Sequence, residues 1–204
     1  MSIMRTSEQA VRPVPPRAVR IDLGKWPGYV AAAWGVLFAV PSFVWATGST
    51  FGARTTVSPS LVKLAHDGVP WFLAVLVATG LLKLFGALVG IGLTRPPGTR
   101  ISRPLVFCGG VAAGLLTWHG GLFVVHGVLV EAGAVSVEPE PAGLTGWYLW
   151  LWGPWFVVGG LAFAGATALY VGRCGDRRRL GRHGVWGTLG ALVLSVATTV
   201  AGIG

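Results

Sequence analysis

Five long apolar segments, separated by short polar stretches, make up most of the chain. They cover approximately residues 27–48, 70–94, 104–130, 147–172 and 185–203. Each approaches or exceeds the roughly 20 residues that a helix needs to cross a hydrocarbon core of about 30 Å. Because the segments are continuously apolar and do not alternate with a period of two, they predict helices and not membrane strands. We therefore expect an all-α integral membrane bundle of five transmembrane helices, with a four-helix core and a C-terminal fifth helix.

Basic residues lie in every second polar stretch and predict the orientation of the bundle. Residues 1–25 and 173–184 each contain five Lys and Arg residues, and residues 95–103 contain three. The two remaining stretches hold only Arg54 and Lys63 between them. Since Lys and Arg collect on the cytoplasmic side of membrane proteins, this alternation predicts a cytoplasmic N-terminus and a C-terminus outside.

The first 25 residues differ from the rest of the chain in composition. They are polar and basic, and they contain Val14-Pro15-Pro16-Arg17, which disfavours a helix. We expect this segment to be a disordered cytoplasmic tail. Residues 26–204 then form a single transmembrane domain.

The composition also narrows the class of partner. Charged residues form only 11% of the chain, against about 25% in soluble domains. The net charge of +9 does not indicate nucleic-acid binding, because 13 of the 16 Lys and Arg residues lie in the three basic stretches. Such stretches attract anionic lipid headgroups, which we expect as partners of the Arg-rich loops. A membrane protein partner or a second copy of the chain stays open.

No motif for a metal or a cofactor is found, so we expect neither. Cys108 and Cys174 lack the spacing of a metal site and are too few for a disulfide framework. Walker, nucleophile-elbow and dinucleotide motifs are missing as well.

Lys83 lies near the middle of the second apolar segment, where a charge costs roughly 2.5–3.5 kcal/mol. It should face the bundle interior, either as a binding residue or as a structural lysine bonded to freed carbonyls. His119 and His126 share one face of the third segment, with His119 at a depth similar to that of Lys83. Together with Glu131 at the outer boundary they predict a polar track. The alternative is that each histidine bonds a backbone carbonyl across a helix contact.

Aromatic residues crowd the outer half of the fourth segment. Two interpretations of this cluster are open. It forms either an aromatic-walled pocket that holds a lipid tail or stabilises a cation, or an aromatic belt at the membrane interface. Glu131 and His119 are the candidate catalytic residues, with Glu138 and Glu140 in the same outer loop. The candidate ligand-binding residues are Lys83, His119, His126, Trp118, Trp150 and Trp155.

Residues 31–57 carry a resemblance to a known family. The matching features are Ala33-Trp34, Phe38-Ala39, Trp45-Ala46-x-Gly48 and Thr50-Phe51-Gly52. They resemble the opening of a bacterial family of short multi-pass membrane proteins, frequent in actinobacteria and catalogued only as a domain of unknown function. The resemblance implies an address in the bacterial cytoplasmic membrane and brings no catalytic residues with it.

Three functions remain open at this point. The absence of catalytic motifs favours a protein that binds or passes a small solute or lipid, or that modulates a membrane complex. The second is a membrane-embedded enzyme acting on an isoprenoid or other lipid, with Glu131 as the acid. The third is a structural subunit of a larger assembly.

Overall fold

The computed structural model describes residues 24–98, 100–136 and 139–200. Most of the predicted tail and Glu138 lie outside these residues. The helices, in chain order, are α1 (Trp26–Ala46), α2 (Pro59–His66), α3 (Pro70–Thr94), α4 (Ser102–Glu131), α5 (Pro139–Trp147), α6 (Gly153–Gly172) and α7 (Arg177–Val200). A short 3-10 helix, η1 (Ala53–Thr55), precedes α2, and a π-helix, η2 (Tyr148–Trp152), joins α5 to α6. The described residues contain no strand, so the prediction of an all-α fold is confirmed.

Four helical stretches are long and apolar enough to cross a membrane. They are α1, α3, α4 and the stretch from Gly143 to Gly172. These stretches agree with the first four apolar segments of the sequence, and they indicate a membrane protein. Residues 185–200 of the fifth predicted span lie in α7, which begins with a cluster of arginines and is not among these four.

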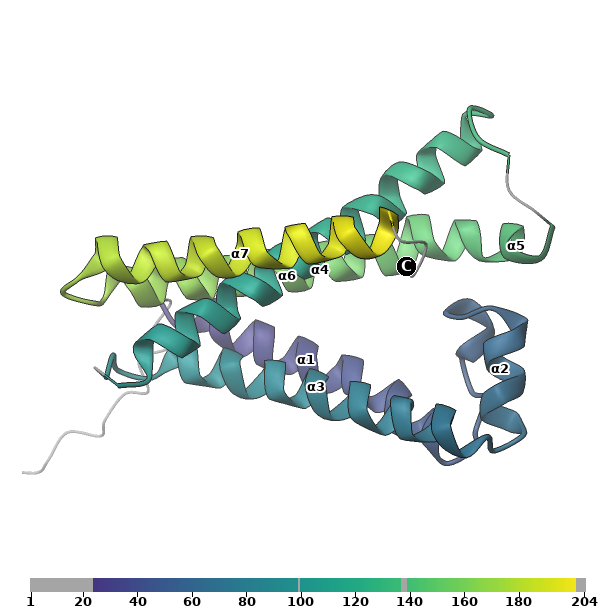
Figure 1. The fold of residues 1–204 in the computed structure, drawn as a ribbon, viewed down its shortest axis with the longest axis horizontal. Coiled ribbons are helices and arrows are strands. Elements are labelled where there is room, and N and C mark those ends of the chain that lie inside the picture. Colours follow the sequence, from purple (N-terminus) through teal and green to yellow (C-terminus); the bar gives the residue numbers. More distant parts are fainter. Residues whose placement is uncertain (1–23, 99, 137–138, 201–204) are drawn as a thin grey trace, which may run out of the picture.

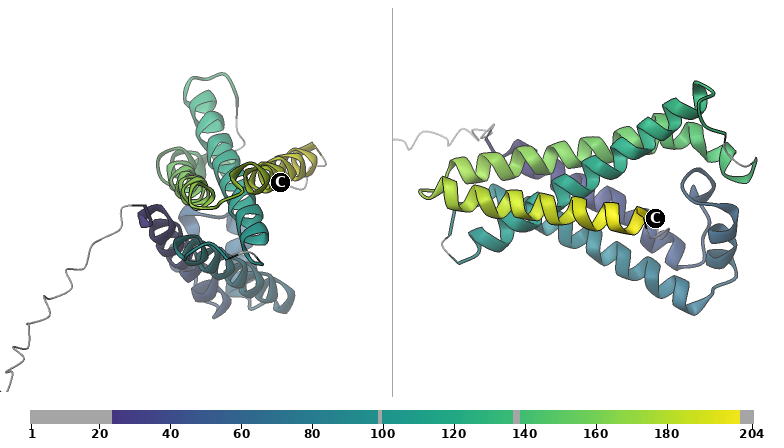
Figure 2. Two further views of the ribbon diagram at one scale, coloured as in Figure 1. Left: turned by 90° about the vertical axis from the view of Figure 1, so that its left-hand side faces the viewer. Right: turned by 45° about the horizontal axis from the view of Figure 1, so that its top comes forward.

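The helices form two groups that diverge towards one end (Figure 1). Helices α1 and α3 pack along each other, and α4 packs against both α6 and α7. The view along the bundle shows α6 and α7 on either side of α4 (Figure 2). Helix α7 therefore lies at the periphery and holds mainly to α4, while α1 joins the two groups through α6.

The two ends of the bundle differ in charge. One end contains the start of α1, residues 95–98 and 100–101, and residues 173–176, and we call it the basic end. The other contains the α1–α3 connection, with η1 and α2, and the α4–α5 connection, and we call it the loop end (Figure 1). The sequence alternation of basic and weakly charged stretches thus corresponds to the two ends of the fold.

Proline and glycine residues mark where several helices begin and end. Proline occupies the first turn of α1, α2 and α3, where its missing N–H costs no hydrogen bond. Helix α3 ends at Thr94 because Arg95 precedes Pro96 and adopts an extended conformation. Helix α4 ends at Glu131, and Gly133, two residues later, has a φ of +72°, the left-handed conformation that commonly follows a helix end.

The π-helix η2 places an extra residue in the turn before α6. The Gly153 N–H donates to the carbonyl of Tyr148, five residues back. Pro154 follows directly and has no N–H to donate. The local break in α-helical hydrogen bonding therefore comes from Gly153 and Pro154.

Glycine residues allow the helices of the α4 group to approach closely. A Cβ at Gly110 of α4 would collide with the carbonyl oxygen of Gly184 in α7, and one at Gly187 with the carbonyl of Phe107. On the opposite side of α4, a Cβ at Gly160 would lie 2.7 Å from the backbone nitrogen of Thr117. These contacts are the small-residue packing typical of membrane helices.

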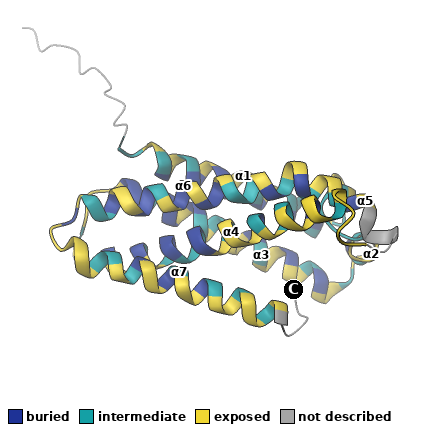
Figure 3. Ribbon diagram, turned by 90° about the horizontal axis from the view of Figure 1, so that it is seen from above, coloured by how far each residue is buried: buried dark blue, intermediate teal, exposed yellow. Residues whose placement is uncertain are grey.

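The outward faces of the helices are apolar. Leu82 and Leu88 of α3 and Val193 of α7 are each between 68% and 69% exposed. Exposed residues run along the outer faces of the helices, and the buried ones face their neighbours (Figure 3). A soluble protein rarely exposes so large an apolar surface, and these faces suit contact with lipid.

Candidate functional site

Lys83 belongs to α3, and its side chain contacts residues of α1. Its Nζ donates a hydrogen bond of 2.7 Å to Oγ of Ser42 and lies 3.7 Å from the centre of the Phe38 ring. Ser42 is only 2% exposed. Lys63 forms a salt bridge with Asp67, and no salt bridge to Lys83 is found in the described part of the chain. Within those residues, the partners of Lys83 are therefore a hydroxyl and an aromatic face, with no carboxylate.

A series of ring contacts leads from Lys83 to His119. The Phe38 ring meets Phe156 of α6 edge to face at 5.1 Å, and Phe156 meets His119 of α4 at 4.9 Å. His119 also lies 4.4 Å from Phe123. We call Phe38, Phe156 and Phe123 the aromatic column. Lys83 and His119 are connected through this column, and no hydrogen bond joins them within the described residues.

The remaining residues of the predicted track lie at the surface of α4. His119, His126 and Glu131 are all exposed. Glu131 accepts a hydrogen bond of 3.2 Å from Nε1 of Trp150, which is itself 73% exposed. No hydrogen bond between the histidines and Glu131 is found in the described part of the chain. The side chain of Glu140 lies outside the described residues.

The two other predicted tryptophans have different surroundings. Trp118 is 38% exposed and lies on the surface of α4. Trp155 of α6 is half-buried and stacks on Trp34 of α1, and its carbonyl accepts a 2.9 Å hydrogen bond from Nε1 of Trp34. The Trp155 Nε1 is buried and has no hydrogen-bond partner. Such a group is costly in an apolar environment, and it provides a donor beside the aromatic column.

Two aromatic residues of η2 form hydrogen bonds to the segment between α1 and α2 at the loop end. Nε1 of Trp152 donates to the carbonyl of Thr55 at 2.7 Å, and the Tyr148 hydroxyl donates to the carbonyl of Thr56 at 2.9 Å. Nε1 of Trp45 also donates to the carbonyl of Phe51 at 2.8 Å. These three bonds hold residues 51–56, which include η1, against η2 and the end of α1.

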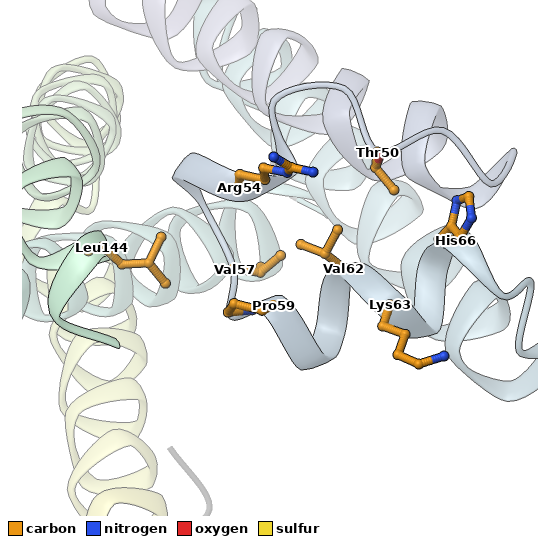
Figure 4. A pocket seen from close by; sticks show the side chains of 9 residues that line it. Thr50, Arg54, Val57, Pro59, Val62, Lys63, His66 and Leu144 are labelled. Atoms are coloured by element: carbon orange, nitrogen blue, oxygen red, sulfur yellow. The ribbon is translucent and has the colours of Figure 1, made fainter. Parts of the chain in front are cut away.

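An open pocket of about 680 Å³ lies at the loop end. Figure 4 shows Arg54, Val57 and Val62 on the η1 and α2 side, with Leu144 of α5 facing them. We call it the loop-end pocket. Its full lining is Thr50, Arg54, Val57, Pro59, Val62, Lys63, His66, Gly143 and Leu144.

The charges of the loop-end pocket are mainly positive. Lys63 forms an ion pair with Asp67, the residue that directly follows α2. Arg54 is exposed and has no ion pair or side-chain hydrogen bond within the described residues. The pocket therefore combines one uncompensated guanidinium with apolar walls. This combination suits an anionic group attached to an apolar body.

The enzyme hypothesis requires a carboxyl group beside a closed apolar pocket. Glu131 does not line the loop-end pocket and is exposed together with Trp150. The geometry gives this hypothesis no support.

Sequence reasoning missed several residues of these sites. Two sequence features could have pointed to the partners of Lys83. Ser42 follows Pro41 directly, and Phe38 lies one turn earlier on the same helix. The sequence indicates Arg54 only as a charge in a weakly charged stretch, and not as part of a pocket. Thr55 and Thr56 contribute backbone carbonyls, which leave no signal in the sequence.

Comparison with protein families gives one match. The family described as Protein of unknown function (DUF3995) matches residues 35–163, which is more than half of the chain. This match confirms the family resemblance and extends it across the first three spans and into α6. No match was found among the curated proteins or among the solved structures.

Proposed function

Because the chain belongs to the family described as Protein of unknown function (DUF3995), we propose a function from its geometry alone. We propose that it is a membrane protein that binds a small amphipathic anion, either a solute or a lipid with one negative group and an apolar body. The observation that carries this proposal is the loop-end pocket, where Arg54 lies beside Val57, Val62 and Leu144.

The size and charge of the pocket support this ligand class. Ligand pockets usually have volumes of about 300–1,000 Å³, and the loop-end pocket has about 680 Å³. Since Asp67 already compensates Lys63, Arg54 is the cation left for a ligand. A carboxylate or phosphate group suits the fork of a guanidinium.

The interior supports a second position for the same anion. The aromatic column leads from the bundle surface at His119 to Lys83, whose charge has no carboxylate partner within the described residues. The ammonium group of Lys83 and the unpaired N–H of Trp155 are both donors.

Native mass spectrometry of protein released from nanodiscs tests the proposal, with dodecanoate as the anionic probe and dodecanol as its neutral counterpart. We expect the wild-type protein to retain dodecanoate and not dodecanol. Arg54→Gln should reduce the retained fraction by about tenfold, because a hydrogen bond to a charged group contributes about 1.5–3 kcal/mol.

Arg100→Gln is the matched control, since Arg100 is also exposed but does not line the loop-end pocket. Its dodecanoate adduct should equal that of the wild type. Equal retention of dodecanol, or an equal loss in both variants, would contradict the proposal. A protein that retains neither probe would favour a role in a larger membrane assembly.

We also propose that the loop end faces outwards and that α7 crosses the membrane to place the C-terminus outside. Residues 183–200 of α7 follow its arginine cluster and span roughly 27 Å as a helix, close to the hydrocarbon thickness of about 30 Å. Alkaline phosphatase fused after Gly204 or Gly133 should be active, and the same enzyme fused after Gly175 should be inactive. An inactive fusion at Gly204 with an active one at Gly133 would show that α7 does not cross.

A further inference from the structure

A second pocket, of about 520 Å³, lies at the basic end. It is formed where the α3–α4 connection and the start of α4 meet the α6–α7 connection and the first turn of α7. Three arginines line it, namely Arg103 of α4, Arg173 after α6 and Arg179 of α7. We call it the arginine pocket.

The arginine pocket has an excess of positive charge. Asp176 is its one carboxylate, and Oδ1 of Asp176 accepts the backbone N–H of Arg179 at 3.2 Å. No ion pair joins Asp176 to a pocket arginine in the described part of the chain. Burial raises the pKa of the Cys174 thiol, against the opposing effect of the Arg173 charge, so the thiol stays neutral at physiological pH. Two positive charges therefore remain uncompensated.

The three arginines differ in how they are held. Arg173 donates from Nη2 to the carbonyl of Leu93 at the end of α3, and its guanidinium lies 5.5 Å from the Tyr170 ring. The side chains of Arg103 and Arg179 make no hydrogen bond or ion pair within the described residues. One guanidinium is thus fixed to the scaffold, and two are available to a ligand.

Buried hydrogen bonds fix the walls of the pocket. The Tyr170 hydroxyl and Ser102 Oγ are 2.8 Å apart, and Ser102 Oγ also donates to the carbonyl of Gly98. Ser102 is 4% exposed and Tyr170 is 1% exposed. These bonds connect α6 to the α3–α4 connection, so the arginines project from a braced framework.

We propose that the arginine pocket binds a phosphate group. Arginine forks match the geometry of phosphate oxygens, and two unpaired guanidinium groups balance one phosphate of charge about −1 to −2. The pocket lies at the ends of the candidate spans, at the depth of lipid headgroups. The phosphate therefore comes either from an anionic phospholipid or from a soluble phosphorylated molecule. The loop-end pocket takes no part in this site.

The test compares two double variants that remove the same charge. Arg103→Gln with Arg179→Gln removes both available pocket arginines. Arg177→Gln with Arg178→Gln removes two neighbouring exposed arginines that do not line the pocket. Each protein is placed in phosphatidylcholine nanodiscs containing about one-tenth phosphatidylglycerol, and the lipid retained on release is measured by native mass spectrometry.

We expect the wild type and the Arg177/Arg178 variant to retain one phosphatidylglycerol, and the Arg103/Arg179 variant to retain at least about tenfold less. A second arm adds glycerol 3-phosphate to phosphatidylcholine nanodiscs. Retention of this molecule, together with its displacement of phosphatidylglycerol, would identify a soluble phosphate compound as the ligand. Equal losses in both double variants would show diffuse attraction to the surface and overturn the proposal.

No retention of either ligand by the wild type would overturn it as well. Thermal melting of each variant checks that the fold is intact, and the wild-type melting temperature is expected for both. Because dodecanoate binding depends on Arg54, it should be unchanged in both double variants. Failure of the phosphate site can therefore be distinguished from failure of the proposed function.

Discussion

Gly120→Ala should lower the free energy of unfolding by about 3 kcal/mol or more. A Cβ at this position of α4 would lie 2.6 Å from the carbonyl oxygen of Gly153 and 2.8 Å from the backbone nitrogen of Val157. Both atoms belong to the α6 backbone, so the collision can be relieved only if the two helices separate. Overpacking of a rigid core typically costs about 1–3 kcal/mol and occasionally more. Denaturation in mixed detergent micelles with increasing SDS measures this change.

The adjacent residue provides the control. A Cβ at Gly121 would meet no atom within 4 Å, so Gly121→Ala should leave stability unchanged or raise it by up to about 1 kcal/mol through helix propensity. The two variants differ by one position and have identical composition. Similar unfolding curves for both would mean that α4 and α6 do not pack through Gly120.

Ser42→Ala should destabilise the protein by about 1–3 kcal/mol, because it leaves the Lys83 ammonium without its hydroxyl partner. Lys83→Met should have the opposite sign and stabilise by about 1–2 kcal/mol, since a lysine at mid-membrane depth is costly. In the Lys83→Met background, Ser42→Ala should be nearly neutral. The same SDS titration gives all four free energies of the double-mutant cycle.

The coupling between Ser42 and Lys83 is the decisive quantity, and we expect about 1–2 kcal/mol. Leu82→Met is the matched control for the lysine variant, because Leu82 is the adjacent residue and is 68% exposed. It should not change the effect of Ser42→Ala. An equal cost of Ser42→Ala with Lys83 and with Met at position 83 would contradict the hydrogen bond.

Hydropathy was enough to predict the helices because the apolar runs end at strong local signals. The predicted segment 70–94 coincides with α3, which begins at Pro70 and ends before Arg95-Pro96. The predicted segment 104–130 lies within α4. In each case a long run of apolar residues can satisfy its backbone in lipid only as a helix. The fifth segment stays a prediction, because α7 combines arginines and apolar residues in one helix.

The site was harder to predict because its contacts depend on backbone atoms and on residues far apart in sequence. Lys83 could be singled out from its depth alone, but its partners Ser42 and Phe38 lie about forty residues away on another helix. The similar depth of Lys83 and His119 stays a prediction, and the two residues are connected through the ring contacts of Phe38 and Phe156. The fold of η1 depends on carbonyl groups of Thr55 and Thr56, which any residue provides.

The π-helix at Tyr148–Trp152 has a consequence for how the chain can vary in length. In a regular helix the loss of one residue rotates everything beyond it by about 100°, which would turn the packed face of α6 away from α4. A π-turn already carries one residue more than an α-turn, so removal of a residue there restores regular winding and keeps the α6 face in place. Between Tyr148 and Trp152 this span can therefore change by one residue over evolutionary time while its packing with α4 is preserved.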